Sequence, residues 1–420
     1  MGIKRVWFVS HYSMPPEYEM RIKTQMYAHY LGLRGIDCTI FSASTIHNTD
    51  VNLITGNEQY IERTYDDLKF VHIKCDQYSG NGYARIKNML QFASRFARIA
   101  NRFPLPDIVV ADANCINYEK IYKFCKSHNI PILIDNRDLW PMSIVEYYKF
   151  IFKNIIIFFS NSNPIIQYLY HRERKMYQRV DGIIFATEGG SNYISDKGWD
   201  EIPKTKCYYI NNGVNLDEFY NQIKENAYPD PDLDDNSSFK VVYAGSIRVA
   251  NNLETVVFAA EKMPKDSNIR ILLYGDGEDK PRLEQYCKDR EISNVIFKGQ
   301  VGKKYIPYIL SKCNLSILNY KKAKTLKYGG SQNKLFEYLA AGCPVLLTVD
   351  MNYNIVTKND CGITLDEPDP AKIAEAIIKI SQLSPEELNQ MGERAKKVAA
   401  EYDFKVLTKR LLRIMEEKVK

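Results

Sequence analysis

One carboxylate stands within an otherwise apolar helical pattern at residues 333–345. Leu335, Phe336 and Leu339 surround Glu337 at helical spacing, which predicts a helix with one buried face. An ionised carboxylate beside such a face costs free energy unless hydrogen-bond donors compensate for the lost water. Ligand hydroxyl groups are donors of this kind, so Glu337 is a candidate binding residue.

The residues that follow predict how this helix ends. Gly342 suits a left-handed helix cap, Pro344 prevents continuation, and Val345–Leu347 is typical of a buried parallel strand. A helix, a tight turn and a strand together form the repeating unit of a doubly wound sheet. On this segment alone, a salt-bridged Glu337 at the edge of any such sheet remains an alternative.

The segment 333–345 resembles the signature region of family-4 glycosyltransferases, which are retaining enzymes of the GT-B fold. The resemblance implies that Glu337 binds the ribose of a nucleotide-sugar donor. It also implies the fold class α/β, specifically GT-B, with two doubly wound Rossmann-like domains and a cleft between them. The resemblance covers nearly the whole chain and is strongest in the second half.

A glycine turn at Gly245 and Ser246 follows a predicted strand and resembles the family's phosphate-binding turn. Glycine here lets a phosphate approach the backbone near a helix N-terminus. In the family a basic residue then neutralises the donor diphosphate, and Arg248 is close enough in sequence to do so. The family's Lys-Gly pair is replaced by Asn251–Asn252, so we expect Lys334 to supply the missing charge. A solvated surface position remains open for both cations.

Other segments resemble further donor-binding parts of the family. Gly275 belongs to a G-D-G turn whose role is chiefly structural, and Val301 ends a segment whose backbone frames the nucleobase. Residues 302–304 offer no carboxylate to recognise guanine, which favours uracil and therefore a UDP-sugar. The loop before the signature helix is expected to bind the donor sugar through backbone amides and neutral side chains, at Gly330, Ser331, Gln332 and Asn333.

This loop departs from the family at one position. Relatives carry a second glutamate eight residues before the position of Glu337, and this chain has Gly329 there. The loss resembles a subgroup related to O-antigen and capsule biosynthesis enzymes, which is an analogy and not a derivation from the residues.

The first half carries the residues expected to bind the acceptor. His11 lies in a loop after the first predicted strand, where GT-B enzymes form the floor of the acceptor cleft, and Arg21 follows as a candidate contact for an anionic acceptor or diphosphate. Residues 135–141 resemble the subgroup's R-D-L-W-P motif, with Arg137 and Asp138 in place of His-Asp. Asp138 is expected to orient the acceptor or polarise its hydroxyl, and joins Arg248 and Lys334 as a predicted catalytic residue. Purely structural roles remain open for His11 and Asp138.

Composition limits the class of protein. The 420 residues allow two domains, and 57 Lys+Arg against 51 Asp+Glu give a net charge of +6, too mild for dedicated nucleic-acid binding. The nine cysteines are scattered without CxxC spacing and are expected to be reduced. No metal-ligand cluster is evident, so neither a metal nor another cofactor is expected. The start of the chain is too short for a signal-peptide core, which predicts a cytoplasmic protein, at the inner face of the membrane if it binds lipid.

Strand-like runs alternate with helical patterns along the chain, beginning with a βαβ unit. We expect strands at 6–9, 38–42, 108–110, 132–134, 182–186, 207–210, 240–244, 269–274, 295–298, 315–318 and 345–347. Residues 1–212 are expected to form the acceptor domain and residues 213–402 the donor domain. The resemblance implies that a helix at 403–420 returns to the first domain, although a helix capping its own domain fits the periodicity nearly as well.

The segment Tyr147–Arg179 combines aromatic residues with cations and is too interrupted to span a bilayer. This pattern is typical of an interfacial membrane element, as a lipid-linked acceptor would require. A helical insertion packed on the core or on another subunit is the alternative.

Together these features predict a retaining glycosyltransferase of hexosyl or N-acetylhexosaminyl type. It would transfer a sugar from a nucleotide-sugar, UDP-linked, to a lipid-linked or oligosaccharide acceptor in surface polysaccharide biosynthesis. A sugar-nucleotide epimerase of the same fold would instead turn over a UDP-sugar with no acceptor present. A non-catalytic carbohydrate- or nucleotide-binding relative would bind ligand without releasing UDP.

Overall fold

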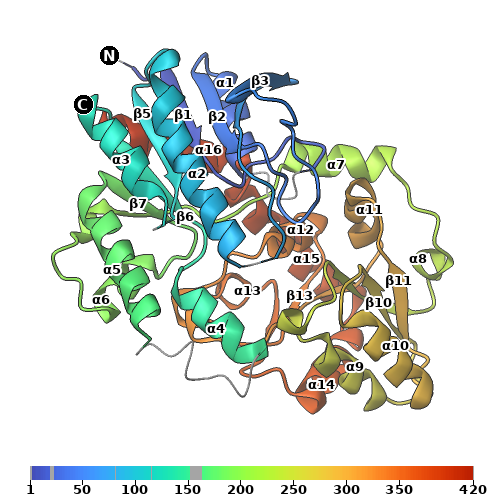
Figure 1. The fold of residues 1–420 in the computed structure, drawn as a ribbon. Coiled ribbons are helices and arrows are strands. Elements are labelled where there is room, and N and C mark those ends of the chain that lie inside the picture. Colours follow the sequence, from blue (N-terminus) through green and yellow to red (C-terminus); the bar gives the residue numbers. More distant parts are fainter. Residues whose placement is uncertain (1, 19–22, 81, 115, 152–162, 420) are drawn as a thin grey trace. The chain divides into compact units, whose positions relative to one another are not determined.

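The computed structural model (Figure 1) describes residues 2–18, 23–80, 82–114, 116–151 and 163–419. The chain forms two compact units. Unit 1 comprises Met1–Val145, Ile155–Asn211 and Phe404–Lys420, and unit 2 comprises Glu146–Asn154 and Asn212–Asp403. Helix α4 (Met142–Ile151) therefore begins in unit 1, and from Glu146 onward it belongs to unit 2. The sequence did not predict this assignment.

Unit 1 is built on an eight-stranded sheet with the order β3-β4-β2-β1-β5-β6-β7-β8. The strands are β1 (Arg5–Val9), β2 (Asp37–Ala43), β3 (Tyr60–Tyr65), β4 (Leu68–Ile73), β5 (Ile108–Asp112), β6 (Ile132–Asn136), β7 (Gly182–Phe185) and β8 (Cys207–Tyr209). All neighbouring strands are parallel except the β3–β4 hairpin. The chain moves from β1 to β2 on one side and later to β5 on the other, so the carboxyl end of β1 is a topological switch point.

Helices α1 (Lys23–Gly32), α2 (Tyr83–Ile99), α3 (Tyr118–Ser127), α5 (Pro164–Arg179) and α6 (Gly190–Asp196) also belong to unit 1. The last helix, α16 (Phe404–Lys418), packs against α1 and buries Leu407 and Leu411. The final amphipathic helix is thus part of unit 1.

Unit 2 contains a six-stranded parallel sheet with the order β11-β10-β9-β12-β13-β14. Its strands are β9 (Phe239–Ala244), β10 (Ile269–Tyr274), β11 (Val295–Gly299), β12 (Leu315–Leu318), β13 (Val345–Leu347) and β14 (Gly362–Thr364). Because β10 lies on one side of β9 and β12 on the other, the carboxyl end of β9 is again a switch point, where ligands of such sheets bind.

Helices cover both faces of this sheet. They are α7 (Leu216–Glu225), α8 (Pro231–Asp234), α9 (Leu253–Glu261), α10 (Lys280–Asp289), α11 (Ile306–Ser311), α12 (Asn333–Ala341), α13 (Ile355–Lys358), α14 (Pro370–Ser381) and α15 (Pro385–Glu401). Two buried apolar clusters result, one with α12 and α15 and the other with α9 and α14.

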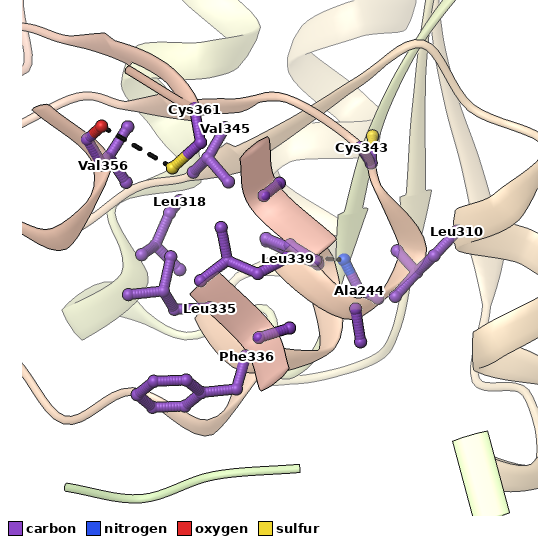
Figure 2. Packing of buried hydrophobic residues seen from close by; sticks show 14 of the residues in the cluster. Ala244, Leu310, Leu318, Leu335, Phe336, Leu339, Cys343, Val345, Val356 and Cys361 are labelled. Carbon is purple, nitrogen blue, oxygen red and sulfur yellow. Dashed lines mark hydrogen bonds between the residues drawn. The ribbon is translucent and has the colours of Figure 1, made fainter. Parts of the chain in front are cut away.

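Helix α12 is the predicted signature helix, and it has the predicted buried face. Leu335, Phe336 and Leu339 lie in one cluster with Leu318 of β12 (Figure 2). Gly342 ends the helix with a φ of 69°, in the left-handed conformation that its sequence position predicts. Glu337 is therefore on a helix whose orientation is fixed by the core.

Candidate functional site

The predicted donor-binding residues all follow the carboxyl ends of four adjacent strands of unit 2. The turns after β9, β10 and β11 and the loop after β12 with the start of α12 contain, in chain order, Gly245, Ser246, Arg248, Gly275, Val301, Gly330, Ser331, Gln332, Asn333, Lys334 and Glu337. Parallel strands present these ends at a single edge of the sheet. The sheet order thus brings segments that are far apart in sequence to one place.

The glycine turns after β9 and β10 lie against each other. The backbone N–H of Gly245 donates to the carbonyl of Tyr274 at 2.8 Å. A Cβ at Gly275 would lie 1.8 Å from the Gly245 carbonyl oxygen, and one at Gly277 would lie 2.3 Å from the Ile247 carbonyl oxygen. No side chain fits at either position, so Gly275 and Gly277 fix the turn after β9 by close backbone contact.

Lys334, the second residue of α12, lies directly over the turn at Gly245. A Cβ at Gly245 would lie 2.4 Å from Cε and 2.8 Å from Nζ of Lys334, so the missing side chain makes room for the lysine. Nζ donates a hydrogen bond to the hydroxyl of Tyr243 at 2.6 Å and lies 4.2 Å from the centre of that ring. The amine is therefore held at the carboxyl end of β9.

Helix α12 is also tied to β9 through Tyr338. Its buried hydroxyl accepts a hydrogen bond from the backbone N–H of Ala244 at 3.1 Å. Strand β9 pairs with β12 only at Val241 and Val242, so beyond them the backbone of β9 needs another partner. The helix that carries Lys334 and Glu337 is thereby fixed relative to the glycine turn.

Lys334 and Glu337 lie one helical turn apart, yet they form no ion pair with each other or with any residue that the structure describes. Burial lowers the pKa of Lys334 to about 7, and the nearby Glu337 offsets this only in part. Burial raises the pKa of Glu337, against the opposing charges of Lys303 and Lys334. Glu337 also accepts no hydrogen bond from the described residues, so its carboxylate is available for a ligand.

Arg248 and Asn251 follow the glycine turn. Arg248 is exposed, and its guanidinium makes no hydrogen bond, ion pair or ring contact with described residues. Asn251 donates from Nδ2 to the carbonyl oxygen of Ser246 at 2.7 Å and to its Oγ at 3.1 Å. Asn251 thus braces the turn but adds no charge, and Lys334 is the cation that lies against Gly245.

The loop before α12 is closely packed around its glycines. Gly329, at the position of the family's second glutamate, is buried with a φ of 97°, a conformation that few side-chain-bearing residues adopt. A Cβ at Gly330 would lie 2.5 Å from Oε1 of Gln332, a buried oxygen without a hydrogen-bond partner in the described structure. Ser331 is half-buried and Asn333 is exposed.

Val301 is half-buried and packs against the cluster that includes α12. Two residues later, exposed Lys303 is close enough for its charge to lower the pKa of Glu337. The loop after β11 therefore adjoins the same helix face as Glu337.

In unit 1, His11 is buried at the carboxyl end of β1, and its tautomer follows from its neighbour Asn88. The Asn88 Nδ2 donates to the carbonyl of Asp76 at 2.6 Å and to Oγ1 of Thr45 at 3.2 Å, so Oδ1 faces Nε2 of His11 at 2.6 Å. Nε2 must then carry the proton. Nδ1 is left as a buried lone pair with no partner among the described residues, and burial lowers the pKa of His11 to about 4.

Arg137 lies in a network of charges at the carboxyl ends of β5 and β6. Its Nε donates to Oδ2 of Asp135 at 2.9 Å, and its guanidinium lies 3.8 Å from Asp112. The buried Lys23 donates to Oδ1 of Asp135 at 3.1 Å and to the carbonyl of Ile210 at 3.0 Å. The charge of Arg137 is therefore largely satisfied within unit 1.

Asp138 is exposed in the loop after β6, next to Arg137 in the chain. Arg21 lies outside the described residues, so its predicted acceptor role has no structural counterpart here. The structure brings His11 and Arg137 to the carboxyl edge of one sheet, in the loops that follow strands β1 and β6.

The predicted membrane segment is described in part, as α4 and α5. On α5, Arg174 pairs with Glu201 at 2.6 Å, Arg179 pairs with Glu119 at 2.9 Å, and Arg172 donates to the carbonyl of Ile116. Ile165 and Tyr168 are exposed on the same helix, at 68% and 58%. Three cations of the basic stretch are thus used within unit 1. No described helix is long and apolar enough to cross a membrane.

Sequence reasoning assigned no role to Tyr243, Tyr338 or Asn88. Tyr243 lies two residues before Gly245 of the glycine turn, and a polar hydroxyl near the end of a buried strand indicates a specific partner. Nothing in the sequence near Asn88 indicates its role, because its contacts to His11 and Asp76 join segments far apart in the chain.

Known proteins resemble this chain in part of its sequence and in its fold. Residues 225–398 match the family described as Glycosyl transferases group 1. No curated protein sequence is similar enough to count as a relative. Among solved structures, sucrose-phosphate synthase from Thermosynechococcus elongatus superposes with a TM-score of 0.73 at 14% identity, over 99% of this chain and 98% of that one.

Two further solved structures show the same fold. WaaG, a glycosyltransferase involved in lipopolysaccharide biosynthesis, has a TM-score of 0.65 at 13% identity, over 98% of this chain and 99% of that one. HepE from Anabaena, solved in complex with UDP, has a TM-score of 0.67 at 10% identity, over 98% of this chain and 100% of that one. The chain thus has the predicted GT-B fold of two Rossmann-like domains, and its residues 225–398 are similar to the glycosyl transferases of group 1.

Proposed function

We propose that this chain is a retaining glycosyltransferase that transfers a sugar from a UDP-sugar to a hydroxyl of a lipid-linked or oligosaccharide acceptor in surface polysaccharide biosynthesis. The observation that carries the proposal is the meeting of Lys334, Gly245 and Glu337 at the switch point of unit 2. A nucleotide-sugar presents a diphosphate next to a ribose. A cation over a glycine turn, with a carboxylate one helical turn away, matches that order of groups.

Each donor group has a partner in this arrangement. The ribose hydroxyls donate to the carboxylate of Glu337, and such charge-assisted hydrogen bonds contribute about 1.5–3 kcal/mol each. The diphosphate accepts from Lys334 and Arg248 and from backbone amides near Gly245. The N-terminus of α12 adds its positive dipole end, which also favours an anion.

The choice of UDP rests on the nucleobase loop and on a structural relative. Residues 302–304 follow Val301 without a carboxylate that would pair with guanine. The similar HepE structure holds UDP, and the similar WaaG acts in lipopolysaccharide biosynthesis. These likenesses support a UDP-sugar and a role in surface polysaccharide biosynthesis.

For the reaction, we propose front-face attack with retention, in which the leaving diphosphate accepts the proton of the acceptor hydroxyl. No separate protein base is then needed. Lys334 and Arg248 stabilise the negative charge that develops on the diphosphate, and removal of one such contact typically costs about 2.7–4 kcal/mol. Asp138, exposed after β6, is proposed to orient the acceptor, and no metal or other cofactor is proposed.

A contact with the inner face of the cell membrane is also proposed, and its basis differs from the sequence prediction. Because Arg174 and Arg179 are paired within unit 1, the contact would rest on exposed Ile165 and Tyr168. Ile165→Ser with Tyr168→Ser should then reduce flotation with anionic vesicles, whereas Tyr353→Ser, at an exposed tyrosine of unit 2, should leave flotation unchanged. A parent protein that never floats at low salt would exclude this contact.

The enzymatic proposal is tested with a panel of nucleotide-sugars. A donor that binds the folded protein raises its melting temperature, and the stabilising donor is then assayed for UDP release with and without candidate acceptors. Acceptor-dependent UDP release with an α-linked donor giving an α-linked product supports the proposal. Conversion of the sugar without an acceptor would indicate an epimerase, and binding without UDP release would indicate a non-catalytic relative.

A further inference from the structure

The hydroxyl of Tyr243 links the glycine turn to Lys334. Tyr243 is fully buried on β9, and its hydroxyl donates to the carbonyl oxygen of Ser246 at 2.7 Å. Because this bond uses the only hydroxyl proton, the contact with Nζ of Lys334 at 2.6 Å must run from the amine to the phenol oxygen. The phenol therefore fixes where Nζ lies.

None of the described groups that face Lys334 forms an ion pair that would stabilise its protonated amine. Tyr243 faces Lys334 from β9, and the ring centre of Tyr320, a residue of the loop after β12, lies 6.0 Å from Nζ of Lys334. Glu337 lies on the same helix as Lys334 and forms no ion pair with it. Burial raises the pKa of both tyrosines, which therefore stay neutral. Arg248 is exposed beyond the turn, and Lys303 faces Glu337.

We propose that Tyr243 positions Lys334 for the donor diphosphate, and that Lys334 takes up a proton when the diphosphate binds. The inference rests on the proposed function and deepens it. After the glycine turn, Asn251 carries no charge and only braces Ser246. The diphosphate would thus supply an anion for Lys334, which forms no ion pair with the described residues.

The affinity of this site for a diphosphate should depend on pH through Lys334. With a pKa of about 7, Lys334 is mostly neutral at pH 8. A diphosphate beside Nζ favours the charged form and raises its pKa, so binding at pH 8 must draw a proton from solution. Affinity for the diphosphate should therefore fall as the pH rises above 7, while affinity for the nucleoside alone should not.

The experiment is isothermal titration calorimetry of the full chain with UDP at pH 8, in two buffers of different ionisation enthalpy. UDP itself is fully ionised there, since a terminal phosphate has a pKa of about 6. The parent is expected to take up nearly one proton per UDP. Lys334→Arg, which stays charged, should bind UDP without proton uptake, and Lys334→Met should bind at least about tenfold more weakly, also without uptake.

Tyr243→Phe tests the positioning role. It should weaken UDP binding about 3- to 10-fold while leaving uridine binding unchanged, because only the phosphate contact is disturbed. Tyr286→Phe, at an α10 tyrosine bonded to Glu261, is the matched control and should change neither.

The possible outcomes separate the two proposals. UDP binding by the parent without proton uptake, or uptake that persists in both Lys334 variants, would overturn this inference and leave the proposed function standing. Equal weakening of UDP and uridine by Tyr243→Phe, or no weakening, would overturn the positioning role. A parent that binds neither UDP nor uridine would overturn the proposed function as well.

Discussion

At the scale of single residues, Glu337 and Lys334 are opposite charges three positions apart that do not pair. On an exposed helix such residues usually attract each other. Here Lys334 bonds to Tyr243 and Glu337 bonds to no described residue, so burial moves the pKa of each towards its neutral form. The two groups are therefore poised to respond to a ligand that carries donors at one end and an anion at the other.

The affinity for the nucleoside should depend on the ionisation of Glu337. Because Glu337 must be ionised to accept the ribose hydroxyls, and burial raises its pKa, uridine affinity should fall as the pH drops through that raised pKa. Binding must then release a proton, which calorimetry detects. Glu337→Gln should make uridine affinity weak and independent of pH over the same range, and an unchanged pH dependence in this variant would contradict the assignment.

The second prediction concerns His11. Its bond to Asn88 requires a proton on Nε2, and its pKa of about 4 keeps the ring neutral above pH 5. Nitrogen-15 NMR of histidine-labelled protein should show the Nε2–H tautomer, with the signal assigned by its loss in His11→Gln. Asn88→Asp should raise the pKa of His11, since a carboxylate favours the imidazolium. A charged His11 at pH 7 in the parent would refute this account.

Residue types in the sequence indicate which side chains could bind a ligand, but they do not show all of the hydrogen-bond and ion-pair partners of those side chains. Glu337 and the glycine turn were predicted from local sequence, because a buried helix face requires apolar residues at helical spacing and an unusual φ favours glycine. The bond from Lys334 to Tyr243 joins residues that lie 91 positions apart, so only the sheet order reveals it. For Arg137 the sequence indicates a cation but not its pairing with Asp135 and Asp112.

At the scale of elements, the paired glycine turns are the part of the site that tolerates least change. A Cβ at Gly275 meets the Gly245 carbonyl oxygen at 1.8 Å, and the backbone at Gly275 has a φ of 149°. Gly275→Ala should therefore lower the free energy of unfolding by more than about 2 kcal/mol. The control is Gly302→Ala, whose Cβ would meet Tyr305 at an ordinary 3.4 Å. Equal stability of the two variants in urea denaturation would contradict the close approach.

The strands that sequence patterns revealed are the apolar parallel ones. All eleven expected strands are present, with ends that differ by a few residues. The hairpin of β3 and β4 was not predicted, because β3 is the polar edge strand Tyr60–Tyr65 and lacks a buried run. Strand β14 was not predicted, because Ile363 is the only large apolar residue in Gly362–Thr364 and the sequence shows no apolar run there.

At the scale of the whole molecule, the alternation of strands and helices was enough to predict two doubly wound sheets. The order of the strands was not predictable from these patterns, and it is this order that makes the ends of β1 and β9 the switch points. The assignment of Glu146–Asn154 to unit 2 also depends on contacts between distant segments, such as the bond from the Lys324 N–H to Glu146.

Calorimetric titration of UDP at pH 7.5 shows whether unit 2 binds the UDP part of a donor through α12 and the glycine turns. We expect one UDP per chain, with affinity about 10- to 100-fold weaker in Glu337→Gln, because a charge-assisted bond to the ribose is replaced by a neutral one. Glu386→Gln, at an exposed glutamate in the first turn of α15, should bind like the parent. Equal UDP affinity in the folded Glu337→Gln variant and the parent would contradict the account.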